Sequence, residues 1–141
     1  MNKVLVINGP NLNMLGMRPK EHYGVLTLEQ INNLILKEND NYFEIEFFQS
    51  NYEGAIITKI QESLETFAII INPAGYTHTS VSIGDALEIY SGHKIEVHLS
   101  KVDERENYRK NNFVREKCEI CFSGKYEQSY IEAINYLKNI K

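Results

Sequence analysis

The residues best suited to acid–base chemistry near the N-terminus of this chain lie in one polar loop. A short apolar run, residues 4–7, leads directly into a segment rich in glycine and asparagine that contains Arg18 and, five residues later, Tyr23. A guanidinium beside a phenol favours the phenolate, which is a base, and the attraction grows when the loop closes and excludes water. This pairing fits a tyrosine base on a mobile loop, although two loop residues without a catalytic role would show the same spacing.

Other candidate groups follow later apolar runs. His98 lies two residues after Glu96, on the same face of an expected strand, where a carboxylate can orient an imidazole, although an ordinary surface pair also fits this spacing. His78 stands where a helix is expected to begin, and this position fits either a capping residue or a ligand-binding residue. Arg105 and Arg109 share a face if their segment is helical, although a solvated charge run also fits them. The hydrogen-bonding candidates are Asn11, Asn51, Asn72 and Ser100.

Apolar periodicity alternates between strand and helix along the whole chain. Strands are predicted at residues 3–8, 44–49, 67–71, 94–99 and 118–122. Helices are predicted at residues 27–39, 55–64, 79–90 and 126–139. A capping box of Thr27 and Gln30 begins the first of these helices, and the strand at 67–71 is apolar enough to be central. The alternation predicts an α/β fold, a doubly wound five-stranded parallel sheet with helices on both faces.

The candidate groups follow the carboxyl ends of the predicted strands, and in a parallel sheet these ends meet at one edge. The long irregular segment at residues 100–117 belongs to the same edge, and loops of that length are more often functional than idle. The edge gathers cationic and hydrogen-bonding groups, with no carboxylate pair and no obvious metal cluster. We therefore expect a site for a small, hydroxylated anion.

The length and the net charge of the chain limit the classes of protein to which it can belong. A chain of 141 residues fits one domain, residues 1–141. The net charge of -4 gives no electrostatic footprint for nucleic acid or for an anionic membrane. No apolar stretch is long enough to span a bilayer, and the first strand follows no basic leader. We expect a soluble, cytoplasmic protein with neither nucleic acid nor membrane as a partner.

The sequence does not match the common cofactor-binding motifs. The loop after the first strand matches neither a P-loop nor a dinucleotide fingerprint, and it lacks the serines and threonines of a flavin phosphate loop. We therefore expect no cofactor and no metal. Cys118 and Cys121 form a Cys-x-x-Cys pair, which occurs in redox and zinc sites. The pair falls within an expected strand, with no second pair elsewhere, so the favoured interpretation is two small buried residues in a core strand.

The order of these motifs resembles that of the type II 3-dehydroquinate dehydratases, small enzymes of the shikimate pathway, which leads to chorismate and the aromatic amino acids. The resemblance covers nearly the whole chain. It rests on Arg18, Tyr23 and Gly24 and on residues 7–16, 49–51, 72–73, 76–80, 85–87, 96–100, 105–106 and 109. It implies a flavodoxin-like fold. It also implies a metal-free and cofactor-free anti elimination of water from 3-dehydroquinate, which gives 3-dehydroshikimate through an enolate.

By this resemblance, the catalytic residues come from two places in the chain: the loop after the first strand and the strand expected at residues 94–99. Tyr23 is the base that takes the proton from C2, and Arg18 stabilises the phenolate. His98 is the acid that protonates the departing C1 hydroxyl, and Glu96 orients it. The resemblance thus implies an acid–base pair.

Substrate binding and assembly follow from the same resemblance. Asn11, with Asn72, holds a water against the enolate oxygen. Asp85 reaches the site of a neighbouring subunit in a trimer, and four trimers form a homo-oligomer of twelve chains, a dodecamer. The carboxylate and hydroxyls of the substrate are bound by Asn72, His78, the backbone around Leu99 and Ser100, Arg105 and Arg109.

The chain departs from the usual pattern of this family at several positions. Pro19 directly follows Arg18 and favours extended backbone there. Ile120 and Tyr126 stand where the family has glycine. None of these differences removes a proton-transfer group. Two other classes of function stay open: a binding protein that keeps the pocket without turnover, and a redox or flavin protein of the same architecture.

Overall fold

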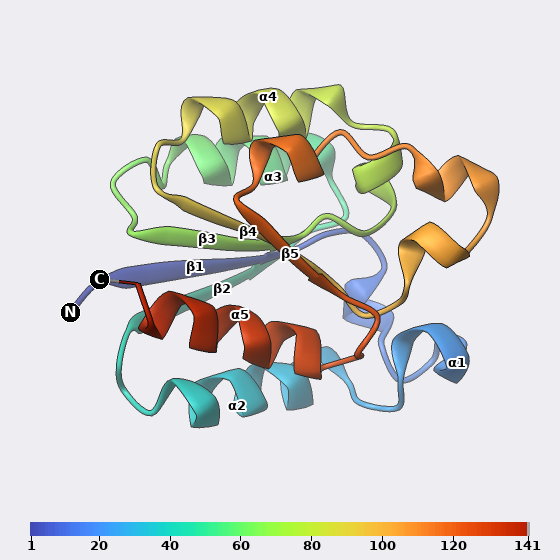
Figure 1. Ribbon diagram of the computed structural model, residues 1–141, viewed down its shortest axis with the longest axis horizontal. Coiled ribbons are helices and arrows are strands. Elements are labelled where there is room, and N and C mark those ends of the chain that lie inside the picture. Colours follow the sequence, from blue (N-terminus) through green and yellow to red (C-terminus); the bar gives the residue numbers. More distant parts are fainter. Residues whose placement is uncertain (141) are drawn as a thin grey trace.

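The computed structural model describes residues 1–140 and shows a sheet between two layers of helices (Figure 1). Five parallel strands pair in the order β2-β1-β3-β4-β5. The strands are β1 (Lys3–Asn8), β2 (Glu44–Gln49), β3 (Ala68–Asn72), β4 (His93–His98) and β5 (Ile120–Ser123). Strand order reverses between β1 and β3, and such a switch point opens a crevice at the carboxyl ends of the strands.

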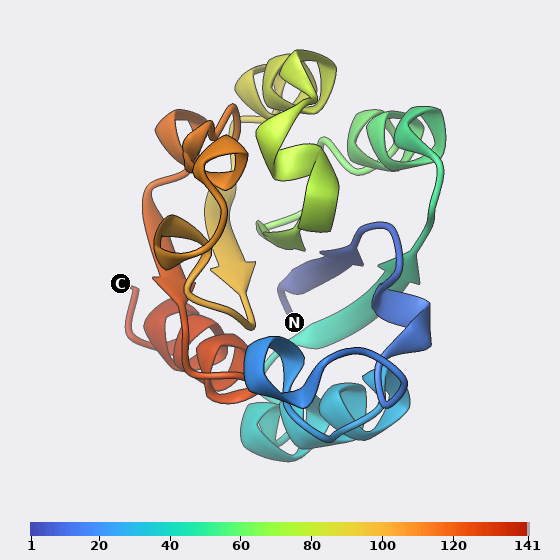
Figure 2. The ribbon, with the colours of Figure 1, turned by 90° about the vertical axis from the view of Figure 1, so that its right-hand side faces the viewer.

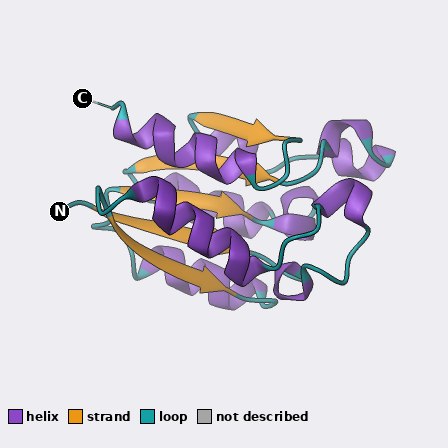
Figure 3. Cartoon of the chain, turned by 90° about the horizontal axis from the view of Figure 1, so that it is seen from below, coloured by secondary structure: helices purple, strands orange, loops and turns teal. Residues whose placement is uncertain are grey.

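Four helices of nine to twelve residues cover the sheet. They are α2 (Leu28–Asn39), α3 (Glu53–Gln61), α4 (Val81–Ile89) and α5 (Gln128–Lys138). Figure 2 looks along the strands and shows α3 and α4 on one side of the sheet, with α2 and α5 on the other. Figure 3 views the sheet from the side of α2 and α5, which lie over the strands and run roughly along them. Within residues 1–140, no helix has the length and apolar character needed to cross a membrane.

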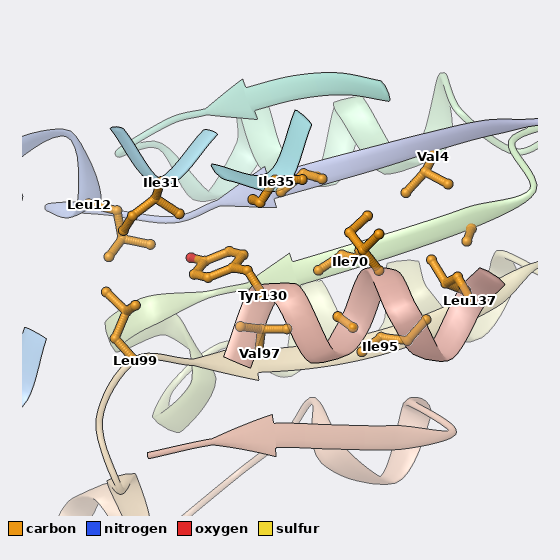
Figure 4. Packing of buried hydrophobic residues seen from close by; sticks show 14 of the residues in the cluster. Val4, Leu12, Ile31, Ile35, Ile70, Ile95, Val97, Leu99, Tyr130 and Leu137 are labelled. Carbon is orange, nitrogen blue, oxygen red and sulfur yellow. The ribbon is translucent and has the colours of Figure 1, made fainter. Parts of the chain in front are cut away.

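Each central strand supplies two hydrophobic cores, because successive side chains point to opposite faces of the sheet. Val4 and Ile70 pack under α2 and α5, against Ile31, Ile35 and Leu137 (Figure 4). The opposite core contains Leu5, Ile7, Ile69 and Ile71 of the strands, with Ile56, Ile60, Ile83 and Leu87 of α3 and α4. Full burial of one such side chain stabilises the fold by about 1.5–3 kcal/mol. The two cores hold the carboxyl ends of β1 and β3 rigidly in place.

The sequence located most elements closely. The predicted bounds of β1 and β2 are confirmed, and β3 is central as predicted. Thr27 caps α2 in the predicted capping box: Thr27 Oγ1 accepts from the Gln30 backbone N–H at 3.2 Å, and Gln30 Oε1 accepts from the Thr27 N–H at 2.9 Å. The other strands and α3 differ from their predicted bounds by one to three residues.

The predicted helix at residues 79–90 is shorter than expected. Ala74–His78 form a separate 3-10 segment, so the α-helix starts only afterwards. Ser80 caps α4, because its Oγ accepts a hydrogen bond from the Ile83 backbone N–H at 3.0 Å. This arrangement leaves the side chain of His78 at the carboxyl edge of the sheet rather than inside a regular helix.

Two further segments differ from the sequence-based prediction. The helix predicted at residues 126–139 begins at Gln128, because Tyr126 has a left-handed φ of 52°, which a right-handed helix does not permit. Residues 20–23, expected as part of an irregular loop, form a single helical turn, α1 (Lys20–Tyr23). Periodicity does not reveal a helix of one turn, because no position in it repeats.

The prediction that Cys118 and Cys121 lie in a core strand is confirmed only in part. Cys121 lies in β5, but Cys118 precedes this strand, and β5 is an edge strand paired only with β4. Both cysteines are half-buried. A short apolar run does not distinguish an edge strand from a central one, because both can bury one face.

Candidate active site

The carboxyl ends of the strands and the loops after them enclose a cavity of about 100 Å³. Figure 2 faces this edge of the sheet, where the blue turn α1 lies beside the red start of α5. Of the site residues predicted from the sequence, Glu96 and Asp85 do not line the cavity. Those that do are Asn11, Arg18, Tyr23, Asn72, His78, His98, Leu99, Ser100, Arg105 and Arg109.

Glu96 and His98 lie on the same face of β4. The Glu96 side chain is fully buried, and its Oε2 lies 2.5 Å from His98 Nε2. Asn112 Nδ2 donates to the same oxygen at 2.7 Å, and Arg115 Nε donates to Oε1 at 3.1 Å. Both carboxylate oxygens therefore accept hydrogen bonds, and the imidazole is held through Nε2, so Nδ1 is its nitrogen for a bound molecule.

The charge of Glu96 is stabilised by this network. Burial alone raises the pKa of the carboxyl, but the hydrogen bond and charge of His98, the Asn112 amide and the Arg115 guanidinium outweigh it and lower the pKa to about 2. The carboxylate is therefore ionised at neutral pH, and its hydrogen bond to Nε2 fixes the orientation of the His98 ring. A buried carboxylate that orients a histidine in this way is a common device of acid–base catalysis.

Tyr23 enters the cavity from α1 and is almost fully buried. Its hydroxyl accepts a hydrogen bond from Arg105 Nη1 at 2.7 Å. The Arg18 guanidinium carbon lies 3.7 Å from the centre of the Tyr23 ring, so Arg18 stacks on the ring face. The resemblance implied that Arg18 stabilises the Tyr23 phenolate, whereas in the structure the residue that donates directly to the Tyr23 hydroxyl is Arg105.

The charged side chains that line the cavity are cationic. Arg18, Arg105 and Arg109 lie close enough to affect one another: burial lowers the pKa of Arg18, and the charges of Arg105 and Arg109 lower it further, although Tyr23 opposes them. Arg109 Nε donates to Glu106 Oε2 at 2.6 Å, at the exposed rim. Among residues 1–140, no aspartate or glutamate lines this cavity. Clustered guanidinium groups of this kind favour a bound anion.

His78 presents a neutral acceptor to the cavity. Its Nδ1 donates to the backbone carbonyl of Asn111 at 2.7 Å. Burial lowers the pKa of His78, and the nearby Arg109 charge lowers it further, so the ring is neutral at pH 7. Nε2 is buried without a hydrogen-bond partner among the described residues. A buried acceptor in a cavity wall is suited to a hydroxyl of the ligand.

Asn72 belongs to a buried chain of hydrogen bonds. Its Nδ2 donates to the Tyr130 hydroxyl at 2.9 Å, and that hydroxyl donates to Asn8 Oδ1 at 2.5 Å. Asn72 Oδ1 accepts from the Ala74 backbone N–H at 3.1 Å. These bonds fix the amide at the floor of the cavity, where β1 and β3 end side by side.

Asn11 and Asp85 occupy contrasting positions. Asn11 lies at the cavity mouth with a left-handed φ of 69°, and its backbone N–H donates to Asn51 Oδ1 at 3.0 Å. Asp85 is exposed on α4, away from the cavity of its own chain. The structure thus brings Asn11 to the site and leaves Asp85 on the outer surface.

Several residues of the site escaped sequence reasoning. Asn112 and Arg115 bind Glu96 across about twenty positions of the chain, and no spacing signal connects them to it. Tyr130 is fully buried and accepts a hydrogen bond from Asn72, a contact that the sequence does not predict. Tyr126 donates from its hydroxyl to the Glu21 carbonyl at 2.8 Å and so contacts α1. Such pairs become visible only when the fold brings distant segments together.

The half-buried thiols form neither a reactive pair nor a convincing metal site. Burial raises the pKa of Cys118, and it raises the pKa of Cys121 to about 12, so both remain protonated at neutral pH. Glu96, His98 and Cys121 lie within ligand distance of one another. However, the Arg115 guanidinium donates to both Glu96 and Cys121, and a fixed cation among these atoms opposes a metal ion.

The fold is a flavodoxin-like α/β sheet, and arginine, histidine and asparagine side chains line the cavity at its carboxyl edge. The family model of class II dehydroquinases matches residues 2–138. The 3-dehydroquinate dehydratases of Francisella tularensis subsp. novicida (strain U112) and Clostridium botulinum (strain 657 / Type Ba4) are each 48% identical to the chain. The first match covers 95% of both chains, and the second covers 99% of this chain and 96% of the relative.

A solved structure agrees with these sequence relatives. The type II dehydroquinase from Butyrivibrio crossotus DSM 2876 has a TM-score of 0.94 to the chain and is 45% identical to it, over 98% of both chains. The chain therefore belongs to the class II dehydroquinase family.

Proposed function

We propose that this chain is a 3-dehydroquinate dehydratase, a hydro-lyase of the shikimate pathway that converts 3-dehydroquinate to 3-dehydroshikimate. The activity of relatives that are 48% identical supports this reaction. The observation that carries the proposal is the cavity itself, in which Tyr23 and His98 stand among three arginines. A base, an acid and a cationic wall are what elimination of water next to a carbonyl requires.

Proton removal is assigned to Tyr23. Its phenolate takes the proton from C2, and the electron pair of the C–H bond moves to the carbonyl oxygen, which gives an enolate. Arg105 donates to the tyrosine oxygen at 2.7 Å, and Arg18 covers the ring, so two cations stabilise the phenolate. Two unit charges at 4 Å attract by about 1 kcal/mol in water and about 4 kcal/mol at an effective dielectric of 20. The buried position of Tyr23 favours the larger value.

The enolate and the leaving group need separate partners. Asn11 and Asn72 at the cavity mouth and floor hold a water that donates to the enolate oxygen. The enolate then expels the C1 hydroxyl, which takes a proton from His98 Nδ1 and leaves as water. Glu96 holds the opposite nitrogen at 2.5 Å and stabilises the imidazolium before this transfer. Tyr23 keeps the proton from C2, and both groups return to their starting states by exchange with solvent.

The substrate is oriented by its carboxylate and hydroxyls. Asn72 and the backbone around Leu99 and Ser100 bind the carboxylate, at the end of β4 where the chain turns away from the sheet. Arg105 Nη1 lies 3.4 Å from Ser100 Oγ and adds positive charge there. His78 accepts from a ring hydroxyl through Nε2, and Arg109 donates to the neighbouring one. The neutral state of His78 suits this role, because only an unprotonated nitrogen can accept.

We also propose that three copies of the chain form a trimer and that four trimers form a dodecamer. Asp85 lies on the outer face of α4 between two exposed apolar side chains, Val81 and Ile89, each four residues away. A row of this kind suits contact with a second copy of the chain. Asp85 then reaches the cavity of the neighbouring subunit. Light scattering of the full chain measures the assembly directly.

The test of the proposed function is turnover. Purified full chain is mixed with 3-dehydroquinate, and the ultraviolet absorbance of the enone product is followed. We expect turnover that Tyr23→Phe lowers by about 10²–10⁴-fold, and that the matched control Tyr136→Phe leaves unchanged. Tyr136 donates its hydroxyl to Glu119 at 2.6 Å and does not line the cavity.

The same assay separates the alternatives. A wild-type chain that binds 3-dehydroquinate without converting it would be a binding protein with a degenerate site. A coloured preparation, or activity that depends on free thiols, would indicate flavin or redox chemistry. Either result would contradict the proposed dehydratase.

A further inference from the structure

The segment that carries Tyr23 cannot hold its position by itself. α1 spans four residues, and the turn is closed by hydrogen bonds from Tyr23 N–H to the Pro19 carbonyl at 3.1 Å and from Gly24 N–H to the Lys20 carbonyl at 2.9 Å. A single helical turn is unstable in water, because nucleation fixes several residues for little gain. Contacts with the rest of the protein must therefore hold α1 against the site.

Tyr126, in the turn before α5, makes two contacts with α1. Its hydroxyl donates to the backbone carbonyl of Glu21 at 2.8 Å, and this carbonyl lies in the last turn of the helix, where such groups have no partner within the helix. Its ring lies against Gly24, because a Cβ added there would be 3.2 Å from Tyr126 Cδ1. Gly24 thus allows the aromatic ring to approach the backbone directly after Tyr23.

The backbone of Tyr126 is fixed on the other side of the site. Its N–H donates to the carbonyl of Leu99 at 3.0 Å, next to His98. Tyr126 adopts a left-handed φ of 52°, a conformation that is unfavourable for a residue with a bulky side chain. Strained residues of this kind persist where the surrounding structure requires them, and they concentrate at functional sites.

The contact between α1 and the rest of the chain is otherwise sparse on this side. A second cavity of about 200 Å³ lies between them, lined by Glu21, His22, Leu99, Arg105 and Tyr126, among others. Because this space is not filled by side chains, α1 is held here by a small number of contacts. We therefore expect the removal of one of them to change how often α1 opens.

We propose that Tyr126 is a positioning residue that acts as a latch: it holds α1 closed and so keeps Tyr23 against Arg105 before substrate arrives. The latch itself does not depend on the chemistry, but its consequence for catalysis rests on the proposed function. Substrate then enters a site whose base is already in place, instead of supplying the free energy of closure from its own binding.

Limited proteolysis of the full chain without substrate tests the latch. The Lys20–Glu21 bond lies inside α1, both residues are exposed, and trypsin must open the turn to cut it. We expect Tyr126→Phe, which loses only the hydroxyl, to speed this cut about fivefold, and Tyr126→Gly to speed it about tenfold or more. Tyr136→Phe, which loses a hydroxyl elsewhere, serves as the control and should leave the rate unchanged.

Thermal unfolding separates a latch from a general loss of stability. Glycine adopts the left-handed conformation of residue 126 without strain, so Tyr126→Gly should keep the wild-type Tm or raise it while α1 becomes easier to cut. Unchanged cutting in both variants would overturn the latch. Faster cutting that is accompanied by a matching fall of Tm in both variants would overturn it as well.

Steady-state kinetics gives a readout that a merely structural role would not produce. Without the latch, substrate binding must also close α1, so KM should rise by about the same factor as the cutting rate, while kcat at saturation changes less than about twofold. A fall of kcat at constant KM would contradict the latch. If the wild-type chain does not turn over 3-dehydroquinate, the proposed function fails, but the proteolysis result still decides whether Tyr126 holds α1.

Discussion

The two halves of the proposed acid–base pair are held in opposite ways. His98 ends a strand inside the sheet, and its partner Glu96 is fully buried and receives hydrogen bonds on both carboxylate oxygens. Tyr23 is carried by a single helical turn at the rim, where Arg105 and Tyr126 hold it in place. The acid is part of the rigid core, whereas the base belongs to a segment that can open.

This difference suits the reaction. Substrate must enter a site that afterwards excludes water, because the attraction between the phenolate and the guanidinium groups is strong only at low dielectric. A fixed acid and a movable base allow substrate to enter and water to be excluded afterwards, since only α1 needs to open and close. The same division predicts that substitutions on the two sides will have different kinetic signatures.

After the loss of Tyr23 itself, the largest expected effect is the loss of the direct donor to this base. Arg105→Gln should lower kcat by about 10²–10³-fold, because it removes the guanidinium that donates to the Tyr23 hydroxyl at 2.7 Å. Lys101→Gln is the matched control, since Lys101 is exposed and pairs weakly with Glu104 at 4.0 Å. Equal kcat values for the two variants would mean that Arg105 does not stabilise the phenolate.

The next effect concerns stability against acid. The pKa of Glu96 is lowered to about 2 in the folded chain from an ordinary value of 4.5. A lowered carboxyl pKa stabilises the fold above the unfolded pKa, and this contribution, about 3 kcal/mol, is lost as the pH falls from about 4.5 towards 2. Urea unfolding at pH 6 and at pH 3 should show a smaller loss in Glu96→Gln than in the wild-type chain.

A third and smaller effect tests the hydrogen bonds to Glu96, the residue that orients His98. Arg115→Gln removes one donor to Glu96 and should lower kcat about tenfold, with KM nearly unchanged, because His98 becomes less well oriented. Lys117→Gln removes a nearby cation that pairs with Glu88 at 3.3 Å and not with Glu96. If Arg115→Gln retained full kcat, the two remaining partners of Glu96 would be sufficient to orient the histidine.

The same division explains what the sequence could predict. The strands and the helices α2 to α5 follow from apolar periodicity and the Thr27 cap, so the parallel sheet and the edge that holds the site were predictable. β4 was predicted to within one residue, and this placed Glu96 and His98 correctly on one face. These features depend on local patterns and on the alternation of buried side chains.

The movable side was less predictable for physical reasons. α1 is too short to have a period, and its position depends on Tyr126, about a hundred residues away. The left-handed φ of Tyr126 contradicted its expected place in a helix. The partner of the Tyr23 hydroxyl was also unexpected, because either Arg18 or Arg105 is long enough to reach it and only the fold selects between them.

Hydrogen exchange of the intact chain, followed by mass spectrometry with and without a saturating unreactive analogue of the substrate, tests the fixed acid and movable base most directly. Without ligand, the amides of α1 should exchange much faster than those of β4. The analogue should slow exchange in α1 and leave β4 unchanged. Equal protection of α1 and β4 in the free chain, or slowing confined to β4, would contradict the division between a fixed acid and a movable base.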